Sequence, residues 1–100
     1  MRYEAFRQRL VDAVLTTPGD TPSALRRAAM ERGPLPTPLA AYVDTVARHA
    51  YKVTDDDIAA LKRDGHNDDA IFEVTVAASL GAALYRLERG MAAVRGEEPD

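Results

Sequence analysis

The feature that most constrains this fold is an uninterrupted run of twelve uncharged residues, Val74–Tyr85, between Glu73 and Arg86. A helix on the surface of a domain normally carries charges on its solvent-facing side, so a helix without them has to be covered all round. Half of this run is small enough for another helix backbone to come close (Ala77, Ala78, Ser79, Gly81, Ala82 and Ala83). We therefore expect a homo-oligomer with this helix at the subunit interface; the alternative is a central helix wrapped within one subunit.

The rest of the chain also has helical rather than strand periodicity. Only two isoleucines occur among the 100 residues, and no long stretch alternates apolar and polar side chains. The length allows one domain, residues 1–100. We predict an all-α fold of about five helices. The first carries an apolar stripe at spacings of three and four, formed by Tyr3, Phe6, Leu10 and Val14.

Two threonine–proline pairs predict the starts of the second and third helices. In Thr21-Pro22 and Thr37-Pro38 a hydroxyl cap precedes a proline in the first helical position, where a missing N–H does no harm. We expect the second helix to end at Gly33. The third is expected to bury one face made of Leu39, Tyr42, Val43, Val46 and Ala50.

Capping signals also define the last two helices. Thr54 with Asp57 three residues later forms a variant capping box, and Gly65 provides the usual left-handed end. Asn67 is expected to cap the longest helix, which can run to about Val94.

Composition excludes several classes of function. The chain has no cysteine, so disulfides, thiolate metal sites and thiol catalysis are excluded, and a reducing cytoplasm is the expected compartment. A net charge of −3 argues against nucleic-acid binding. The charge-free run is shorter than the ~20 residues that cross a bilayer, so no membrane association is expected. Eleven arginines against two lysines, with eighteen alanines, fit a GC-rich bacterial genome.

Three segments together resemble one known family. They are Ala50–Asp57, Gly65–Glu73 and Ala82–Leu87, and they are similar to the alkylhydroperoxidase D/carboxymuconolactone decarboxylase superfamily. The resemblance implies an all-helical homo-oligomer. In the peroxidase branch of that family, a Cys-x-x-Cys-x-x-x-His run precedes the glycine-plus-acidic turn.

The redox positions of that branch are all replaced in this chain. The resemblance places the two family cysteines at Ala50 and Val53, the following histidine at Asp57 and the upstream glutamate near Pro38. Peroxide reduction of that kind needs a thiolate of lowered pKa and a second thiol that closes the disulfide. We therefore expect the scaffold without peroxidase activity, acting as an oligomeric scaffold or as a module that binds a small ligand or a protein partner.

The alternative is an enzyme of the decarboxylase or lactone-processing kind. Its acid–base residues would be His49, Tyr51, Glu73 or Arg86 around an inter-helix pocket. In the structural interpretation, His49 is a residue at a helix C-terminus, and Glu73 and Arg86 form ion pairs or helix caps. Three consecutive acids, residues 55–57, lack calcium-loop spacing and fit helix capping, so no metal or other cofactor is expected.

Overall fold

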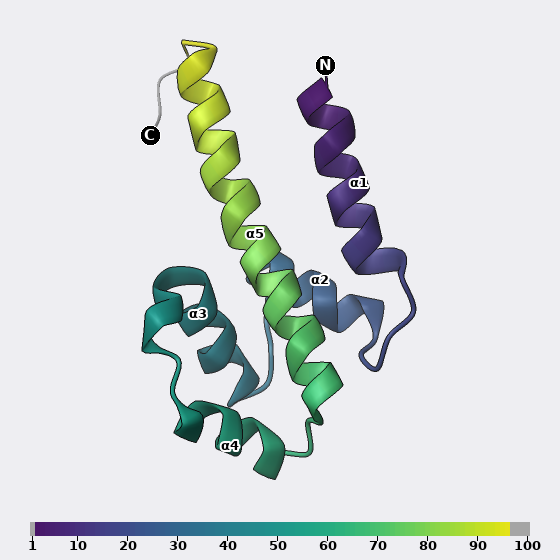
Figure 1. Cartoon of the computed structure of the whole chain (residues 1–100), viewed down its shortest axis with the longest axis vertical. Helices are drawn as coiled ribbons and strands as arrows, with labels where there is room; N and C mark the ends of the chain where they lie inside the picture. The colour runs from purple at the N-terminus through teal and green to yellow at the C-terminus, as the bar shows by residue number, and fades with distance from the viewer. Residues whose placement is uncertain (1, 97–100) are drawn as a thin grey trace.

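The computed structural model describes residues 2–96 and is all-helical over that range (Figure 1). The prediction of an all-α chain with about five helices is confirmed. The elements in chain order are α1 (Arg2–Thr16), α2 (Ser23–Glu31), α3 (Leu39–His49), the 3-10 turn η1 (Ala50–Lys52), α4 (Asp55–Arg63) and α5 (Asp68–Val94).

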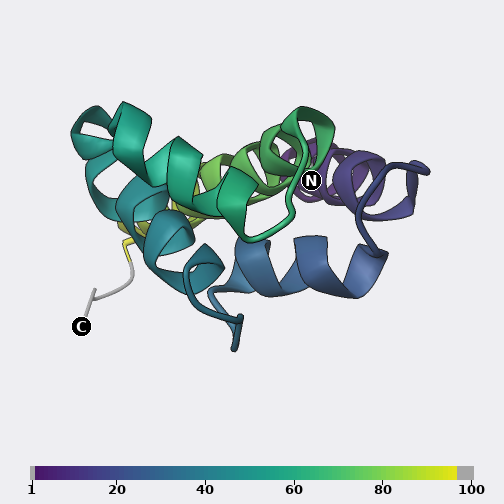
Figure 2. The ribbon, with the colours of Figure 1, turned by 90° about the horizontal axis from the view of Figure 1, so that it is seen from below.

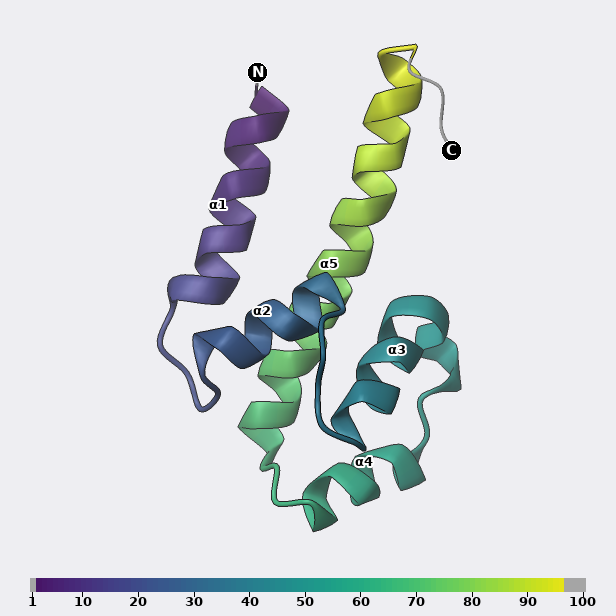
Figure 3. The ribbon, with the colours of Figure 1, turned by 180° about the vertical axis from the view of Figure 1, so that it is seen from behind.

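Helix α5 is the axis on which the other helices are arranged. Helix α2 crosses behind it in Figure 1 and in front of it in the reverse view of Figure 3. Seen from below, α1 lies at one side and α3 with α4 at the other (Figure 2). The crossing with α2 requires Gly81, because a Cβ there would lie only 2.0 Å from the backbone oxygen of Met30.

The core lies where α2 and α3 meet the first two thirds of α5. Its residues are mostly aliphatic: Leu15, Ala29, Met30, Leu39, Tyr42, Val43, Val46, Leu61, Ile71, Val74, Ala77 and Ala78. The buried Tyr42 hydroxyl is hydrogen-bonded to Thr75 Oγ1 at 2.6 Å, which satisfies its polar end within the core. The predicted face of α3 is confirmed except at Ala50, which is exposed and begins η1 because the helix ends at His49.

The buried face of α1 differs from the predicted stripe. Phe6 is 48% exposed, whereas Leu15, outside that stripe, is buried. Val11 and Val14 pack against the core beside it. The predicted stripe is correct at Val14 and wrong at Phe6, because only the last turns of α1 reach the core.

The caps of α4 and α5 follow the prediction. Thr54 Oγ1 accepts from the Asp57 N–H at 3.2 Å while the Asp57 carboxylate accepts from the Thr54 N–H at 2.9 Å, a complete capping box. Gly65 follows α4 at φ +99°. Asn67 Oδ1 accepts from the Ala70 N–H at 2.8 Å and caps α5, which ends at Val94 as predicted.

The caps predicted for α2 and α3 were wrong by one residue. Pro22 and Pro38 are themselves the N-cap residues, and neither helix has a side-chain cap. The Thr21 hydroxyl instead donates to Glu73 on α5. Helix α2 also ends before Gly33: the left-handed residue is Arg32, at φ +58°, and the Gly33 N–H closes the turn on the Ala28 carbonyl.

One face of α5 is left open by the described residues. It consists of seven uncharged, exposed residues, here called the α5 stripe: Phe72, Val76, Ser79, Ala83, Leu87, Gly90 and Val94. No other helix lies over the near side of α5 in Figure 1. The expectation that this helix is covered all round is therefore not met within a single chain.

By length and composition alone, α5 also passes as a helix able to cross a membrane, as core helices of soluble proteins do. A third of its most apolar 18-residue window is buried inside the fold.

Candidate functional site

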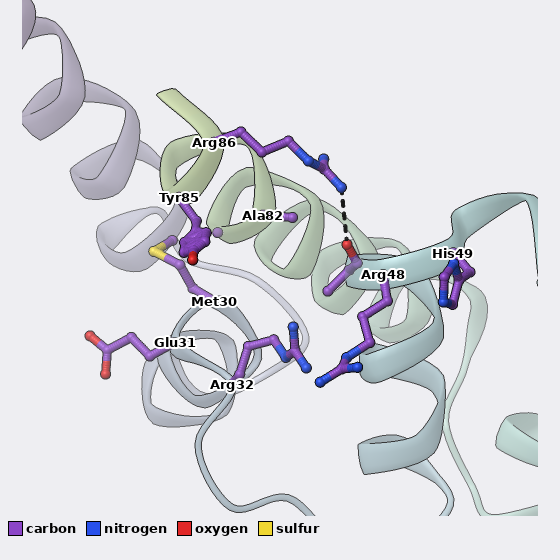
Figure 4. A pocket seen from close by; sticks show the side chains of 10 residues that line it. Met30, Glu31, Arg32, Arg48, His49, Ala82, Tyr85 and Arg86 are labelled. Atoms are coloured by element: carbon purple, nitrogen blue, oxygen red, sulfur yellow. Dashed lines mark hydrogen bonds between the residues drawn. The ribbon is translucent and has the colours of Figure 1, made fainter. Parts of the chain in front are cut away.

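The candidate site is a cleft between the C-terminal end of α2, the C-terminal end of α3 and the middle of α5 (Figure 4). Its volume is about 640 Å³, within the range of small-molecule pockets. The residues that line it are Met30, Glu31, Arg32, Ala47, Arg48, His49, Gly81, Ala82, Tyr85 and Arg86. Apolar atoms come from all three helices, and the charged groups are mostly guanidinium groups.

The cleft has an excess of positive charge. Arg32 and Arg48 both contact the same oxygen, Oδ1 of Asp44, at 2.7 and 3.1 Å, so two cations share one carboxylate. Their guanidinium groups approach each other in Figure 4, while the Glu31 carboxylate points away from them. Glu31 in turn pairs with Arg27, outside the cleft, at 3.4 Å.

Arg86 adds a third guanidinium group to this cleft. Its Nη2 donates to the Ala47 carbonyl at 3.4 Å, which is a neutral acceptor (Figure 4). Among residues 2–96, no carboxylate lies within salt-bridge distance of Arg86. The cleft therefore presents more cationic than anionic groups beside an apolar floor, an arrangement suited to an organic anion.

A second cleft, between α1, α2 and α5, is larger and carries nearly equal numbers of cationic and anionic groups. Its volume is about 780 Å³, and its lining includes three arginines and four carboxylates: Arg7, Arg27, Arg89, Glu4, Asp12, Glu31 and Glu88. On this side of the molecule the Tyr3 hydroxyl donates to the Glu88 carboxylate at 2.6 Å. This hydrogen bond lowers the pKa of the Glu88 carboxyl group. Nothing in this lining selects a ligand by charge.

Glu73 belongs to neither of these clefts, because it is held in a structural network at the start of α5. Its carboxylate accepts hydrogen bonds from the Thr21 hydroxyl at 2.6 Å, the Thr21 N–H at 2.8 Å and the Asp20 N–H at 2.8 Å. Arg26 Nη1 lies 3.6 Å away, as expected for an ion pair with a neighbouring helix. These contacts fasten the α1–α2 loop to α5.

The network keeps Glu73 ionised. The hydrogen bond from the Thr21 hydroxyl, followed by the bond from the Asp20 N–H, holds the pKa of Glu73 below its ordinary value, and Arg26 acts in the same direction. Partial burial opposes this effect and is outweighed. A general acid near neutral pH needs a raised pKa. The Glu73 carboxyl group is therefore unsuited to that role.

The structure brings together only two of the four residues considered for acid–base chemistry. His49 and Arg86 line the cleft, whereas Glu73 lines a separate pocket of about 210 Å³ beside α1. Tyr51 is 81% exposed and meets the His49 ring edge-on, with 5.9 Å between ring centroids. His49 is the last residue of α3, at the helix C-terminus where the structural interpretation of the sequence placed it.

The positions matched to the family's redox relay have structural roles here. Pro38 is the N-cap of α3, and Asp57 belongs to the capping box of α4. Ala50 is exposed in η1, and Val53 packs against the core. Within the described residues, no group of three His, Asp or Glu side chains could hold a metal ion.

Sequence reasoning missed the residues that give this site its charge. Arg48 reaches Asp44 within α3, but Arg32, sixteen positions before Arg48, reaches Asp44 only because the fold brings the end of α2 close to α3. The one available signal was Asp44 four residues before Arg48 on a helix, the spacing of an intrahelical ion pair. Nothing in the sequence spacing indicated that Arg32 also contacts Asp44.

Comparison with protein-family models, with curated proteins and with solved structures finds no match for this chain.

Proposed function

We propose that this chain is a thiol-free helical module of the alkylhydroperoxidase D type, without peroxidase activity, that assembles as a homo-oligomer and binds a small organic anion in the α2–α3–α5 cleft. The observation that carries the binding role is the unbalanced group of Arg32, Arg48 and Arg86 beside apolar atoms of Met30 and Tyr85. Arginine binds carboxylates through paired N–H donors, which gives the site its preference for an anion.

The separation of the acid–base residues supports binding rather than turnover. Glu73 is engaged by Thr21 and Arg26 at a different pocket, and Tyr51 is 81% exposed and does not line the cleft. Glu31 is the one carboxylate in the lining of the cleft, and it pairs with Arg27 instead of His49. The decarboxylase-type alternative called for acid–base residues among His49, Tyr51, Glu73 or Arg86 around one pocket. Only His49 and Arg86 share the cleft, so this geometry supports that alternative less than it supports binding.

The order of elements supports the scaffold proposed here. The segment matched to the family begins at η1, continues through the capping box of α4 and the glycine turn at Gly65, and leads into the long α5. We place the module in the cytoplasm because it has no cysteine to protect or oxidise.

Calorimetric titration with two matched probes tests the binding role. Benzoate and benzamide have nearly the same shape, and only benzoate is charged. We expect benzoate to bind at least about tenfold more tightly, since hydrogen bonds to charged groups contribute about 1.5–3 kcal/mol. Arg86→Gln should remove most of that preference, whereas Arg63→Gln on α4, outside the cleft, should not. Equal affinity for both probes would refute the proposal.

A further inference from the structure

A small pocket beside the Arg26–Glu73 ion pair shares no lining residue with either of the two clefts. It has a volume of about 210 Å³ and lies between the end of α1, the loop that follows α1 and the start of α5. At about 30 Å³ per water molecule, this space is enough for about seven waters, or for a benzene ring with a short side chain. Its walls are mostly apolar and are formed by Ala13, Val14, Pro18, Phe72 and Val76.

Arg26 of α2 also lines this space, here called the Arg26 pocket, and its side chain is only 7% exposed. Arg26 Nη2 donates to the Leu15 carbonyl at 3.3 Å, and Nη1 lies 3.6 Å from Glu73 Oε1, an ion-pair distance that is too long for a hydrogen bond. The third nitrogen, Nε, is buried and has no hydrogen-bond partner among residues 2–96. Buried donors in native proteins nearly always have an acceptor, so Nε indicates an acceptor that comes from outside the chain.

Glu73, the other charged residue of the Arg26 pocket, has acceptor capacity left. Its Oε1 accepts from both the hydroxyl and the N–H of Thr21, whereas Oε2 accepts only from the Asp20 N–H, at 2.8 Å. A carboxylate oxygen can accept two hydrogen bonds, so one position on Oε2 remains. The lowered pKa of Glu73 keeps this group ionised at neutral pH, and an ionised carboxylate acts only as an acceptor.

The opposite charges of these two residues select for a neutral ligand. An added anion would be repelled by Glu73 and an added cation by Arg26, because the two groups lie within one ion pair. Burying a further charge without a partner of its own is also costly. A hydroxyl group is neutral and is the smallest organic group that both accepts and donates a hydrogen bond.

We propose that the Arg26 pocket binds one small neutral alcohol, with its apolar body between α1 and α5 and its hydroxyl group at the Arg26–Glu73 pair. The hydroxyl oxygen accepts from Arg26 Nε–H, and the hydroxyl hydrogen is donated to Glu73 Oε2. Phe72 and Val76 are 67% and 38% exposed, and the apolar body covers part of both side chains. This site is distinct from the anion cleft of the proposed function and does not rest on it.

Two probes of nearly the same shape test the polar contact. Ethylbenzene has a methyl group where benzyl alcohol has its hydroxyl group. A purely apolar pocket favours ethylbenzene, because a hydroxyl group that is buried without a partner loses its hydrogen bonds to water. We expect benzyl alcohol to bind about tenfold more tightly, with a dissociation constant on the order of 1 mM for so small a ligand.

Titration of the full chain followed by heteronuclear NMR measures both dissociation constants. Ethylbenzene that binds as tightly as benzyl alcohol would overturn the proposal, and so would the absence of benzyl alcohol binding. The first result is the one expected if an ordered water already serves as the acceptor of Arg26 Nε.

The same spectra locate the bound alcohol. The Nε–H resonance of Arg26 should shift with benzyl alcohol and much less with ethylbenzene. The backbone N–H of Arg63 on α4, outside the pocket, is the reference and should shift with neither probe. An Arg26 Nε–H resonance that does not respond to benzyl alcohol would overturn the proposed contact.

Filling the pocket tests its position without altering the ion pair. Ala13 is an exposed residue of α1 that lines the pocket, so Ala13→Phe should fill the space and abolish measurable binding of benzyl alcohol, with unchanged helical circular dichroism. Ala5→Phe is the matched control, because Ala5 is also exposed on α1 but lies outside the pocket. This control should bind benzyl alcohol as the wild type does. Wild-type affinity in Ala13→Phe would overturn the proposal.

A competition experiment separates this site from the anion cleft. Saturating benzoate should leave the affinity for benzyl alcohol unchanged, and Arg86→Gln should bind benzyl alcohol as the wild type does, since Arg86 lines only the cleft. Failure of benzoate binding alongside retained binding of benzyl alcohol would refute only the proposed function. Displacement of benzyl alcohol by benzoate would overturn the Arg26 pocket as a separate site.

Discussion

Removing the charge of Glu73 should destabilise the fold in a pH-dependent way. The Glu73 side chain is 19% exposed and accepts three hydrogen bonds, while the Arg26 side chain is 7% exposed and its Nε is buried without a hydrogen-bond partner among the described residues. Glu73→Gln keeps one carbonyl oxygen for the Thr21 and Asp20 donors but leaves Arg26 without its counter-charge. Hydrogen bonds to charged groups contribute about 1.5–3 kcal/mol, which is the expected loss.

A larger truncation sets the upper limit of this effect. Glu73→Ala leaves three donors unpaired and the buried Arg26 guanidinium group with only its hydrogen bond to the Leu15 carbonyl. Breaking a buried ion pair from one side costs about 3–5 kcal/mol. That approaches the whole stability of a small domain, about 5–15 kcal/mol. Glu73→Gln is therefore the variant that keeps a measurable folded state.

The sign of the pH dependence follows from the lowered pKa of Glu73. A carboxyl whose pKa is lowered by folding contributes its full stabilisation above the unfolded value of 4.5, and this is lost as the pH falls through the folded value. Urea unfolding at one fixed chain concentration should show the full wild-type-to-Gln difference at pH 7. The difference should shrink progressively below about pH 4.5 as wild-type Glu73 becomes protonated.

Glu88→Gln is the matched control for this measurement. The pKa of Glu88 is also lowered, mainly by the Tyr3 hydroxyl, but the group is exposed and solvent screens its contacts. Its substitution should leave the free energy of unfolding nearly unchanged. The reasoning fails if Glu73→Gln costs no more than Glu88→Gln, or if its cost is the same at pH 3 as at pH 7.

Three further outcomes test the fold and the excluded chemistry. Gly81→Ala should cost about 1–3 kcal/mol, because its methyl group meets Met30, whereas Gly33→Ala meets ordinary contacts at 3.7 Å and should be nearly neutral in urea unfolding. Thr54→Ala should lower stability by about 0.5–2 kcal/mol in thermal unfolding, but Thr37→Ala, which caps nothing, should not. A coupled peroxidase assay with an organic hydroperoxide should give background rates, and sustained turnover by metal-free protein would contradict the thiol argument.

Local chemistry made much of the fold predictable. The capping box at Thr54, the Asn67 cap and the left-handed Gly65 depend on residues within four positions of one another, so the sequence displays them directly. The helical class followed from spacing in the same way. The Arg26–Glu73 ion pair was predicted only as a kind of contact, since the identity of the arginine depends on tertiary packing.

The errors arose where a hydrogen-bond or ion-pair partner distant in the sequence replaced the local partner that the pattern indicated. Thr21 resembles a helix cap, but its hydroxyl finds a stronger, ionised acceptor in Glu73, 52 residues away. The cleft was beyond sequence reasoning for the same reason, because Arg32 and Arg48 meet only after α3 folds back. A linear pattern shows which groups are available and cannot show which of them will meet.

The position of α5 after the helices that it packs against has a consequence for biosynthesis. Helices α2 and α3 find their principal partner in residues that the ribosome makes after them, around Ile71 to Leu84. Until that segment leaves the exit tunnel, their apolar faces have no surface to pack against, and short helices are marginal in water by themselves. The α2–α3–α5 core therefore assembles only after α5 has been made, and until then the apolar faces of α2 and α3 are exposed to aggregation.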